Sequence, residues 1–300
     1  MLHPVTPAGE IALEITLVLA LGAALIFAAV MLLLGRALTH RQPRRPINRW
    51  AWLFGGGIVF PITVLSALLA YSTARTLQLI EPSADRMVIT VTGVQWWWEV
   101  TYRDPTGRKI VAANELRIPV GRPITLGLST RDVIHSFWVP ALGGKVDMVP
   151  GRVHQMHVQV TAAGIYRGVC AEFCGDQHAK MALPVVALAP EEFDRWLAAQ
   201  GEPARSNSST QRGQQLFAQL RCDACHTVRG LFEASQVGPD LTHVAARPYI
   251  GAGALPTSEG NFRDWVAHLQ RVKPGARMPS YGHLDDESLA ALAAFLASLQ

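Results

Sequence analysis

The sequence predicts a multi-domain membrane protein with two N-terminal transmembrane helices, a β-sandwich or Greek-key β-barrel, and a small all-α domain. Three observations carry this prediction. Two long apolar runs precede residue 75, short strand-like segments fill residues 87–189, and helical spacing dominates residues 211–300. A length of 300 residues allows roughly two folded domains. At 49% hydrophobic and 17% charged residues, the chain is more apolar than a typical soluble protein.

The two apolar runs, residues 11–34 and 51–72, each reach the roughly 20 residues that a helix needs to cross a bilayer. A cleaved signal peptide is the alternative for the first run, but no Lys or Arg precedes it and it is too long for such a segment. Glu14 lies within it. Pro61 and Gly55–Gly57 interrupt the second run, which a membrane helix tolerates. We therefore expect residues 1–80 to form a two-helix transmembrane hairpin.

The connection between the runs is strongly basic. It contains five arginines and no acid: Arg36, Arg41, Arg44, Arg45 and Arg49. By the positive-inside rule this short loop is cytoplasmic, which places both termini and everything after residue 75 outside. The pI of about 9.0 partly reflects this loop, so it does not indicate a nucleic-acid partner.

Residues 81–200 are expected to form the β domain. Short apolar segments alternate with Gly and Pro turns, such as DPTG at 104–107, and no helical period intervenes. From residue 155 to 160, Gln and His alternate with Met and Val, as in a half-buried strand. A helical segment at 190–200 closes the domain, with Glu191 and Glu192 in its first turn, where the helix dipole favours acids.

Residues 201–210 are polar and indicate a linker. Beyond it, segments 211–222, 261–272 and 285–300 have helical spacing, and Asp285 is placed to cap the last helix. The all-α domain is therefore expected at 211–300.

The motif CDACH points to covalent attachment of a c-type haem in this domain. Cys222 and Cys225, three residues apart, can reach two vinyl groups of one porphyrin, and His226 can then bind the iron. A thioether suits the second axial position, and Met278 is the one methionine after the motif. A thioredoxin-like redox pair is the alternative, but the βαβ context is missing. As further possible iron ligands, the chain offers His243, His268 and His283.

A second cluster, CAEFCGDQHAKM at 170–181, gathers soft metal ligands. Cys170 and Cys174 could form a disulfide, and a thioredoxin-like copper carrier also uses this cysteine spacing. A mononuclear blue-copper site would use Cys174, His178, Met181 and the upstream His135, but it leaves Cys170 without a role. Two thiolates bridging two copper ions would use all five side chains, with a backbone carbonyl of the loop as the last ligand.

With these motifs, residues 1–200 resemble subunit II of a haem–copper cytochrome c oxidase, and residues 211–300 resemble a class I cytochrome c. The resemblance also covers 133–152, around His135, and the aromatic run at 95–99. It implies a cupredoxin-like Greek-key barrel that holds the binuclear copper centre CuA. Glu172 is then expected to give its main-chain oxygen to copper and its carboxylate to a magnesium ion shared with subunit I.

The same resemblance implies that electrons reach the copper through Trp96, whereas packing between barrel and membrane explains Trp97 and Trp98 equally well. In GPDL, at 238–241, it implies that the carbonyl of Pro239 orients the haem histidine.

The implied function is the electron-accepting subunit of an aerobic terminal oxidase, a proton-translocating oxidoreductase. Electrons from cytochrome c would pass through the chain's own haem c and CuA to the haem–copper site of subunit I, where oxygen is reduced to water. The implied partners are subunit I, other oxidase subunits, membrane lipid, and a soluble or membrane cytochrome c or bc1-type complex as donor. The implied location is the bacterial inner (cell) membrane, multi-pass, with both metal-binding domains on the periplasmic side.

Two alternatives stay open from the sequence. A nitric oxide reductase subunit of the same fold can also carry CuA. A freestanding membrane-anchored redox carrier or copper-delivery protein would need no large partner.

Overall fold

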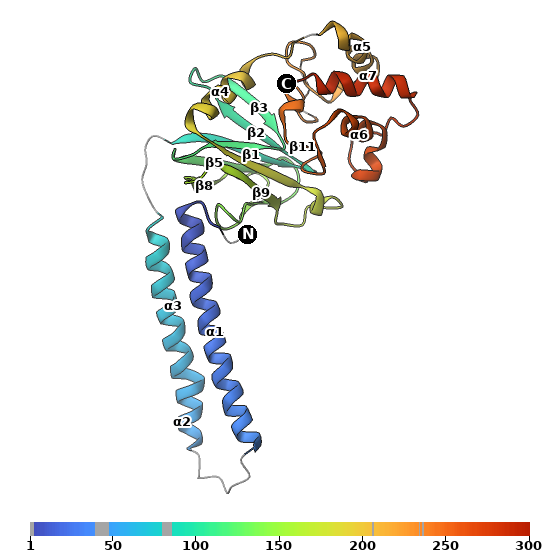
Figure 1. Ribbon diagram of the computed structural model, residues 1–300. Helices are drawn as coiled ribbons and strands as arrows, with labels where there is room; N and C mark the ends of the chain where they lie inside the picture. The colour runs from blue at the N-terminus through green and yellow to red at the C-terminus, as the bar shows by residue number, and fades with distance from the viewer. Residues whose placement is uncertain (1–2, 40–47, 80–85, 206, 234, 236) are drawn as a thin grey trace. The chain divides into compact units, whose positions relative to one another are not determined.

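The computed structural model describes residues 3–39, 48–79, 86–205, 207–233, 235 and 237–300 (Figure 1). The chain divides into two compact units, one built from residues 7–83 and the other from residues 3–6 and 84–300. Most of the basic loop, residues 40–47, and the expected boundary at residues 80–81 lie outside the described residues.

The smaller unit is helical and apolar. It consists of α1 (Pro7–Thr39), α2 (Arg49–Phe54), the π-helical turn η1 (Gly55–Val59) and α3 (Phe60–Leu77). The stretches Pro7–Thr39 and Arg49–Leu77 are each long and apolar enough to cross a membrane. The glycines form the π-helical turn, and Pro61 lies in the first turn of α3, where its missing N–H is tolerated.

Glu14, the acid inside the first apolar run, is neutralised within this unit. Its carboxylate pairs with the guanidinium of Arg75 and accepts a hydrogen bond of 2.7 Å from the hydroxyl of Tyr71. Both partners lie on α3. A charged side chain in an apolar helix is tolerated when it is paired in this way.

The larger unit begins with a β-sandwich of two five-stranded sheets. Its strands are β1 (Met87–Val94), β2 (Trp97–Arg103), β3 (Lys109–Ala113), β4 (Leu116–Pro119), β5 (Ile124–Thr130), β6 (His135–Trp138), β7 (Val146–Met148), β8 (His154–Val158), β9 (Gly164–Cys170) and β10 (Ala182–Leu188). The strand orders are β3-β2-β1-β5-β8 and β4-β10-β9-β6-β7. The β1–β5 and β4–β10 pairs are parallel and the others antiparallel. The predicted cupredoxin-like fold class is confirmed.

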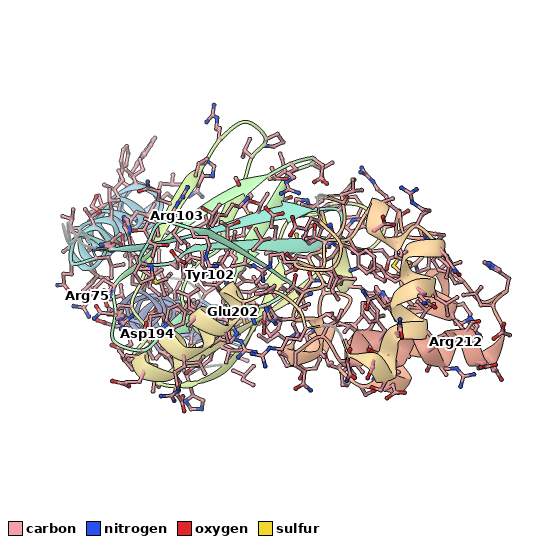
Figure 2. All side chains as sticks on the ribbon, turned by 90° about the horizontal axis from the view of Figure 1, so that it is seen from above. Arg75, Tyr102, Arg103, Asp194, Glu202 and Arg212 are labelled. Atoms are coloured by element: carbon pink, nitrogen blue, oxygen red, sulfur yellow. The ribbon has the colours of Figure 1, made fainter. Side chains whose placement is uncertain are left out.

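Helix α4 (Pro190–Gly201) follows the sandwich and packs against it. It places Phe193 and Trp196 on the ring of Tyr102, with centroids 6.3 and 5.1 Å from the tyrosine. Figure 2 labels Tyr102 and also Asp194, which lies on this helix. Burial raises the pKa of Tyr102 above its ordinary range, so its hydroxyl stays neutral and bonds to the backbone of Arg117.

The N-terminal residues 3–6 belong to the β-sandwich unit, which the sequence did not suggest. The backbone N–H of Val5 donates to the carbonyl of Ala141, and the N–H of Thr161 donates to the carbonyl of Val5. Val5 is buried in the sandwich core. The segment before the first long helix is therefore tied to this domain.

Residues 207–300 contain three longer helices, as predicted: α5 (Gln211–Gln219), α6 (Glu259–Val272) and α7 (Asp286–Ala297). Short 3-10 turns η3 (Ser208–Thr210), η4 (Cys222–Ala224) and η5 (Val244–Ala246) and the strand pair β11 (Tyr249–Ile250) and β12 (Leu255–Pro256) connect them. The side chain of Asp285 accepts the N–H of Ser288 at 2.7 Å, which confirms the predicted N-cap.

The contact between α5 and α7 depends on Gly213. A Cβ at this position would lie 2.0 Å from the carbonyl oxygen of Ala291, so the two helix backbones touch only because the residue is glycine. We expect Gly213→Ala to destabilise the domain by about 1–3 kcal/mol, as overpacking does. Thermal unfolding of the full chain measures this loss.

Gly260→Ala is the matched control, because a Cβ at that helical position meets nothing within 4 Å. Alanine there should leave the melting temperature unchanged or raise it, since alanine favours a helix. An equal loss of stability in both variants would contradict the packing argument.

Candidate functional site

The first candidate site lies where β6 and β9 run side by side. In their antiparallel pairing, Cys170 at the end of β9 lies opposite Phe137, and His135, two residues earlier at the start of β6, lies close to the same sulfur. His135 is fully buried. The chain then turns through the 3-10 turn η2 (His178–Lys180), which returns His178 and Met181 to the same place.

Two free, buried thiols form the centre of this site. The sulfurs of Cys170 and Cys174 lie 3.7 Å apart, so they do not form the disulfide that the sequence left open. Nδ1 of His135 lies 3.8 Å from the sulfur of Cys170, and Nδ1 of His178 lies 3.6 Å from the sulfur of Cys174. The sulfur of Met181 lies 3.9 Å from that of Cys174. The imidazole of His135 therefore lies beside Cys170, and that of His178 beside Cys174.

The backbone of Glu172 lies at the thiol cluster, whereas its side chain points to the surface. Its carbonyl oxygen lies 3.2 Å from the sulfur of Cys170. Its carboxylate is exposed and accepts from the ammonium of Lys145 at 3.0 Å, and that ammonium also binds Asp147. Among the residues that the structure describes, the metal-ligating group with atoms in mutual reach is His135, Cys170 and Cys174, without this carboxylate.

The donor set fits two soft copper ions better than one. A mononuclear blue-copper site needs one thiolate. Here a second buried thiol lies 3.7 Å from the first. The hydrogen bond from Cys174, assisted by His135, lowers the pKa of Cys170 to about 3. Cys170 is therefore held as a thiolate, the form that binds metals.

Several residues that orient this site were missed from the sequence. Nε2 of His135 lies 2.9 Å from the carboxylate of Asp132, whose other oxygen accepts the backbone N–H of Gln95 at 2.7 Å. A Cβ at Gly93 would lie 2.8 Å from the ring of His135. A carboxylate on the second nitrogen of a metal-binding histidine fixes its tautomer and orientation. The one signal in the sequence for these orienting residues was an acidic residue, Asp132, three positions before His135.

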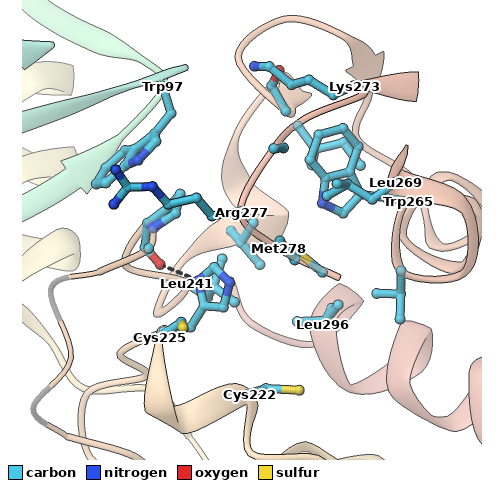
Figure 3. A pocket seen from close by; sticks show the side chains of 18 of the residues that line it. Trp97, Cys222, Cys225, Leu241, Trp265, Leu269, Lys273, Arg277, Met278 and Leu296 are labelled. Atoms are coloured by element: carbon cyan, nitrogen blue, oxygen red, sulfur yellow. Dashed lines mark hydrogen bonds between the residues drawn. The ribbon is translucent and has the colours of Figure 1, made fainter. Parts of the chain in front are cut away.

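The second candidate site is a cavity in the α-helical domain. Cys222, Cys225 and Met278 line it, as do apolar side chains such as Leu269 (Figure 3). His226 and Phe262 also belong to its lining. The cavity wall also includes residues of the β-sandwich: Val94, Gln95, Trp96, Trp97 and Asn114. An apolar cavity with two cysteines, a histidine and a methionine on its walls fits a covalently attached haem.

His226 is held in the form that an iron ligand requires. Its Nδ1 donates to the carbonyl of Pro239 at 2.8 Å, drawn as the dashed line in Figure 3, as the resemblance implied. Its Nε2 is then free to bind a metal. Burial lowers the pKa of His226, so the imidazole is neutral. Gly238 makes this approach possible, because a Cβ there would lie 2.7 Å from the ring.

The segment that carries Met278 is fixed by Gln270. The side-chain amide of Gln270 donates to the carbonyls of Ala276 and Met278 at 2.7 and 2.8 Å. The alternative ligand His243 has both ring nitrogens bonded to backbone carbonyls, those of Gln300 and Glu202. Neither His268 nor His283 belongs to the described cavity lining.

Trp96 touches both sites. Its indole N–H donates to the carbonyl of Cys174 at 2.9 Å, and its side chain lines the second cavity. Trp97 also lines that cavity, and Trp98 is fully buried against His135 and Phe137 in the sandwich. Both side chains are buried within the larger unit.

Hydrogen bonds join the β-sandwich to the α-helical domain at several points. They include Lys273 Nζ to Trp96 O (2.6 Å), Gln177 Nε2 to Pro274 O (2.7 Å), Lys180 Nζ to Val272 O (2.6 Å), Ala182 N to Ala252 O (3.0 Å) and Arg117 to Ala246 O (3.0 Å). Of the chain's four lysines, Lys273 is the buried one.

Burial of Lys273 predicts a pH dependence of stability. Desolvation, reinforced by Lys180 and opposed by Cys174, lowers the pKa of Lys273 from 10.5 to about 7. Between about pH 7 and 10.5 the unfolded chain binds a proton here that the folded chain does not, so stability rises with pH. From pH 7 to 9 this contribution is about 2 kcal/mol.

Lys273→Met should remove this rise, because methionine does not titrate. The measurement is thermal unfolding of the copper-free full chain at pH 7 and pH 9, compared between the two proteins, so that other titrating groups cancel. An identical pH dependence in both would contradict the assignment.

The fold and both sites define a membrane-anchored protein with an extracytoplasmic cupredoxin-like domain and a cytochrome c domain. Residues 105–188 match the family model "Cytochrome C oxidase subunit II, periplasmic domain", and residues 210–300 match the model "Cytochrome c". Cytochrome c oxidase subunit 2 of Alkalihalophilus pseudofirmus is 35% identical over 81% of this chain and 71% of its own. The subunit of Bacillus sp. strain PS3 is 31% identical over 81% and 72%. The chain belongs to the cytochrome c oxidase subunit 2 family.

Two solved structures are also similar. The periplasmic domain of cytochrome oxidase subunit II of Bradyrhizobium japonicum is 31% identical, with a TM-score of 0.37, and the match covers 40% of this chain and 95% of that one. A heme-copper terminal oxidase dimer is 20% identical, with a TM-score of 0.28, over 58% of this chain and 98% of that one.

Proposed function

We propose that this chain is the electron-accepting subunit of an oxygen-reducing terminal oxidase, built from a membrane hairpin (1–80), a copper domain (81–200), a linker (201–210) and a haem domain (211–300). The observation that carries the proposal is the position of Trp96, whose side chain lines the haem cavity and whose indole bonds the carbonyl of Cys174. One residue therefore connects two sites that each fit a one-electron carrier.

His135, Cys170, Cys174, His178, Met181 and the carbonyl of Glu172 would hold the two copper ions, and Cys222, Cys225, His226 and Met278 would hold the haem. When bound, the two groups supply reversible one-electron chemistry, which relays electrons from a cytochrome c donor toward subunit I. The protein's part is to exclude water and to fix the ligands. Asp132 orients His135 and Pro239 orients His226, and the burial of His135, Cys170, Cys174 and Met181 limits reorganisation at the copper site.

Magnesium binding by Glu172 belongs to this proposal. Magnesium usually takes one or two carboxylates and keeps several waters. The carboxylate of Glu172 is exposed on the surface and shares Lys145 with Asp147, so a partner subunit could reach it. The oxygen-reducing, proton-translocating site itself would lie in subunit I.

A periplasmic position of both termini in a bacterial inner membrane is likewise proposed. Residues 3–6 are bonded to the same β-sandwich that carries the copper ligands, which supports an outside N-terminus. Arg36 and Arg49 flank the connection between the apolar helices, as the positive-inside rule expects of a cytoplasmic loop.

The test is to purify the complex from membranes and compare oxygen uptake with nitric oxide consumption. Oxygen uptake driven by a reduced cytochrome c is the expected result. Nitric oxide consumption without oxygen uptake would assign the chain to a nitric oxide reductase. Purification without a multi-helix haem partner would favour the freestanding carrier and overturn the subunit assignment.

A further inference from the structure

A buried lysine lies between the two candidate redox sites. Lys273 follows α6 as its C-cap residue, and its side chain lines the haem cavity with Trp96 and Met278. Only 4% of its surface is exposed. Its backbone N–H completes α6 by bonding to the carbonyl of Leu269 at 2.7 Å, which fixes where the side chain starts.

The partners of its ammonium belong to two domains. Nζ donates to the carbonyl of Trp96 at 2.6 Å in the copper domain and to the carbonyl of Gly251 at 3.1 Å in the haem domain. Within the described part of the chain, no ion pair neutralises Lys273. Burying an ammonium whose only partners are carbonyl oxygens destabilises the folded chain. The same burial lowers the pKa of Lys273 to about 7.

The other bonds between the domains do not involve Trp96. Gln177 and Lys180 hold the carbonyls of Pro274 and Val272, on either side of Lys273, and Arg117 holds the carbonyl of Ala246. Docking therefore does not need Lys273. What Lys273 adds is a direct link from the wall of the haem cavity to the backbone of the tryptophan that bonds Cys174.

We propose that Lys273 is a positioning residue that holds Trp96 between the haem cavity and the copper-binding loop. Its role in electron transfer rests on the proposed function, whereas its role in ordering Trp96 does not. The electron-transfer step concerned moves one electron from the haem site to the copper site, and forms or breaks no bond. Lys273 acts by fixing the geometry through which that electron passes.

The test compares Lys273→Met with Arg117→Met, which loses the hydrogen bond from Arg117 to the carbonyl of Ala246 between the same domains and keeps the bond from Lys273 to Trp96. The first readout is hydrogen exchange in the full chain before copper is added. We expect exchange at residues 94–98 to become on the order of tenfold faster in Lys273→Met, since the buried hydrogen bond from Lys273 to the carbonyl of Trp96 is lost. In Arg117→Met these residues should exchange as in the unmodified chain.

The second readout is the rate of electron transfer from haem to copper in the purified oxidase after rapid reduction of the haem. We expect about tenfold slowing in Lys273→Met, because small misplacements of a transfer path are costly, and no change in Arg117→Met. Unchanged exchange and unchanged rate in Lys273→Met would overturn the proposal, as would equal effects in both variants. A complex without haem or dicopper signals in the unmodified protein would instead overturn the proposed function, and the exchange measurement would still decide the role of Lys273.

Discussion

Cys170→Ser should abolish the dicopper centre while the chain still folds. Serine is nearly the same size, but its hydroxyl does not replace a thiolate as a bridge between two soft copper ions. We expect the mixed-valence dicopper signal in electron paramagnetic resonance to disappear, with at most one copper retained per chain. Oxidase activity should fall by more than about 100-fold, beyond the 10–100-fold typical of changes around a metal's ligands.

The matched control is Cys222→Ser, a change of the same type in the haem motif. It should leave the dicopper signal intact and weaken covalent haem attachment, because Cys222 lines the haem cavity, whereas Cys170 belongs to the separate cluster with His135 and Cys174. A blue-copper spectrum that is the same before and after Cys170→Ser would sink the binuclear interpretation. It would show that Cys174, His135, His178 and Met181 suffice for a single copper.

The proposed ligands were predictable because their spacing is local. In both CAEFCGDQHAKM and CDACH the donors lie within a dozen residues, so one loop or one helical turn brings them together. Two ligands needed long-range placement: His135, which lies beside Cys170 where β6 pairs with β9, and Met278, which lines the haem cavity with the CDACH residues. The fold class was predictable for a similar reason, since apolar runs and strand alternation are properties of short windows.

The residues that orient the ligands were not predictable. Gln95 and Gly93 act through tertiary contacts that no nearby sequence signal marks, and for Asp132 the one signal is its position three residues before His135. The order of the strands in the two sheets also has no local signal, since β1 pairs with β5 over a separation of more than 30 residues. The same holds for residues 3–6, which bond to loops 136 or more residues away.

The contact between the copper and haem domains is the clearest case of information that only a structure holds. Lys273 and Trp96 are 177 residues apart, and each has an ordinary sequence context. A lysine near the end of an amphipathic helix is normally solvated, and here it is buried because the copper domain covers it. The surface of the haem domain around Lys273 is therefore complementary to the copper domain.

Met278→Leu should lower the reduction potential of the haem by on the order of 0.1 V, a fraction of the roughly 0.8 V range that axial ligands set. The thioether favours the reduced iron, and leucine fills the same space without a donor atom. Because about 59 mV is a tenfold change for a one-electron couple, the haem would be far harder to reduce by the same donor. A redox titration of the haem absorbance in the full chain measures the shift.

His283→Leu is the control, since His283 is an alternative axial ligand by chemistry and lies outside the described cavity lining. It should leave the potential unchanged. Gln270 supports Met278 as the ligand, because its side-chain amide bonds to the carbonyls of Ala276 and Met278 and so fixes the segment that carries the thioether. If Met278→Leu left the potential unchanged and His283→Leu lowered it, the second axial ligand would be the histidine, and the argument from the cavity would fail.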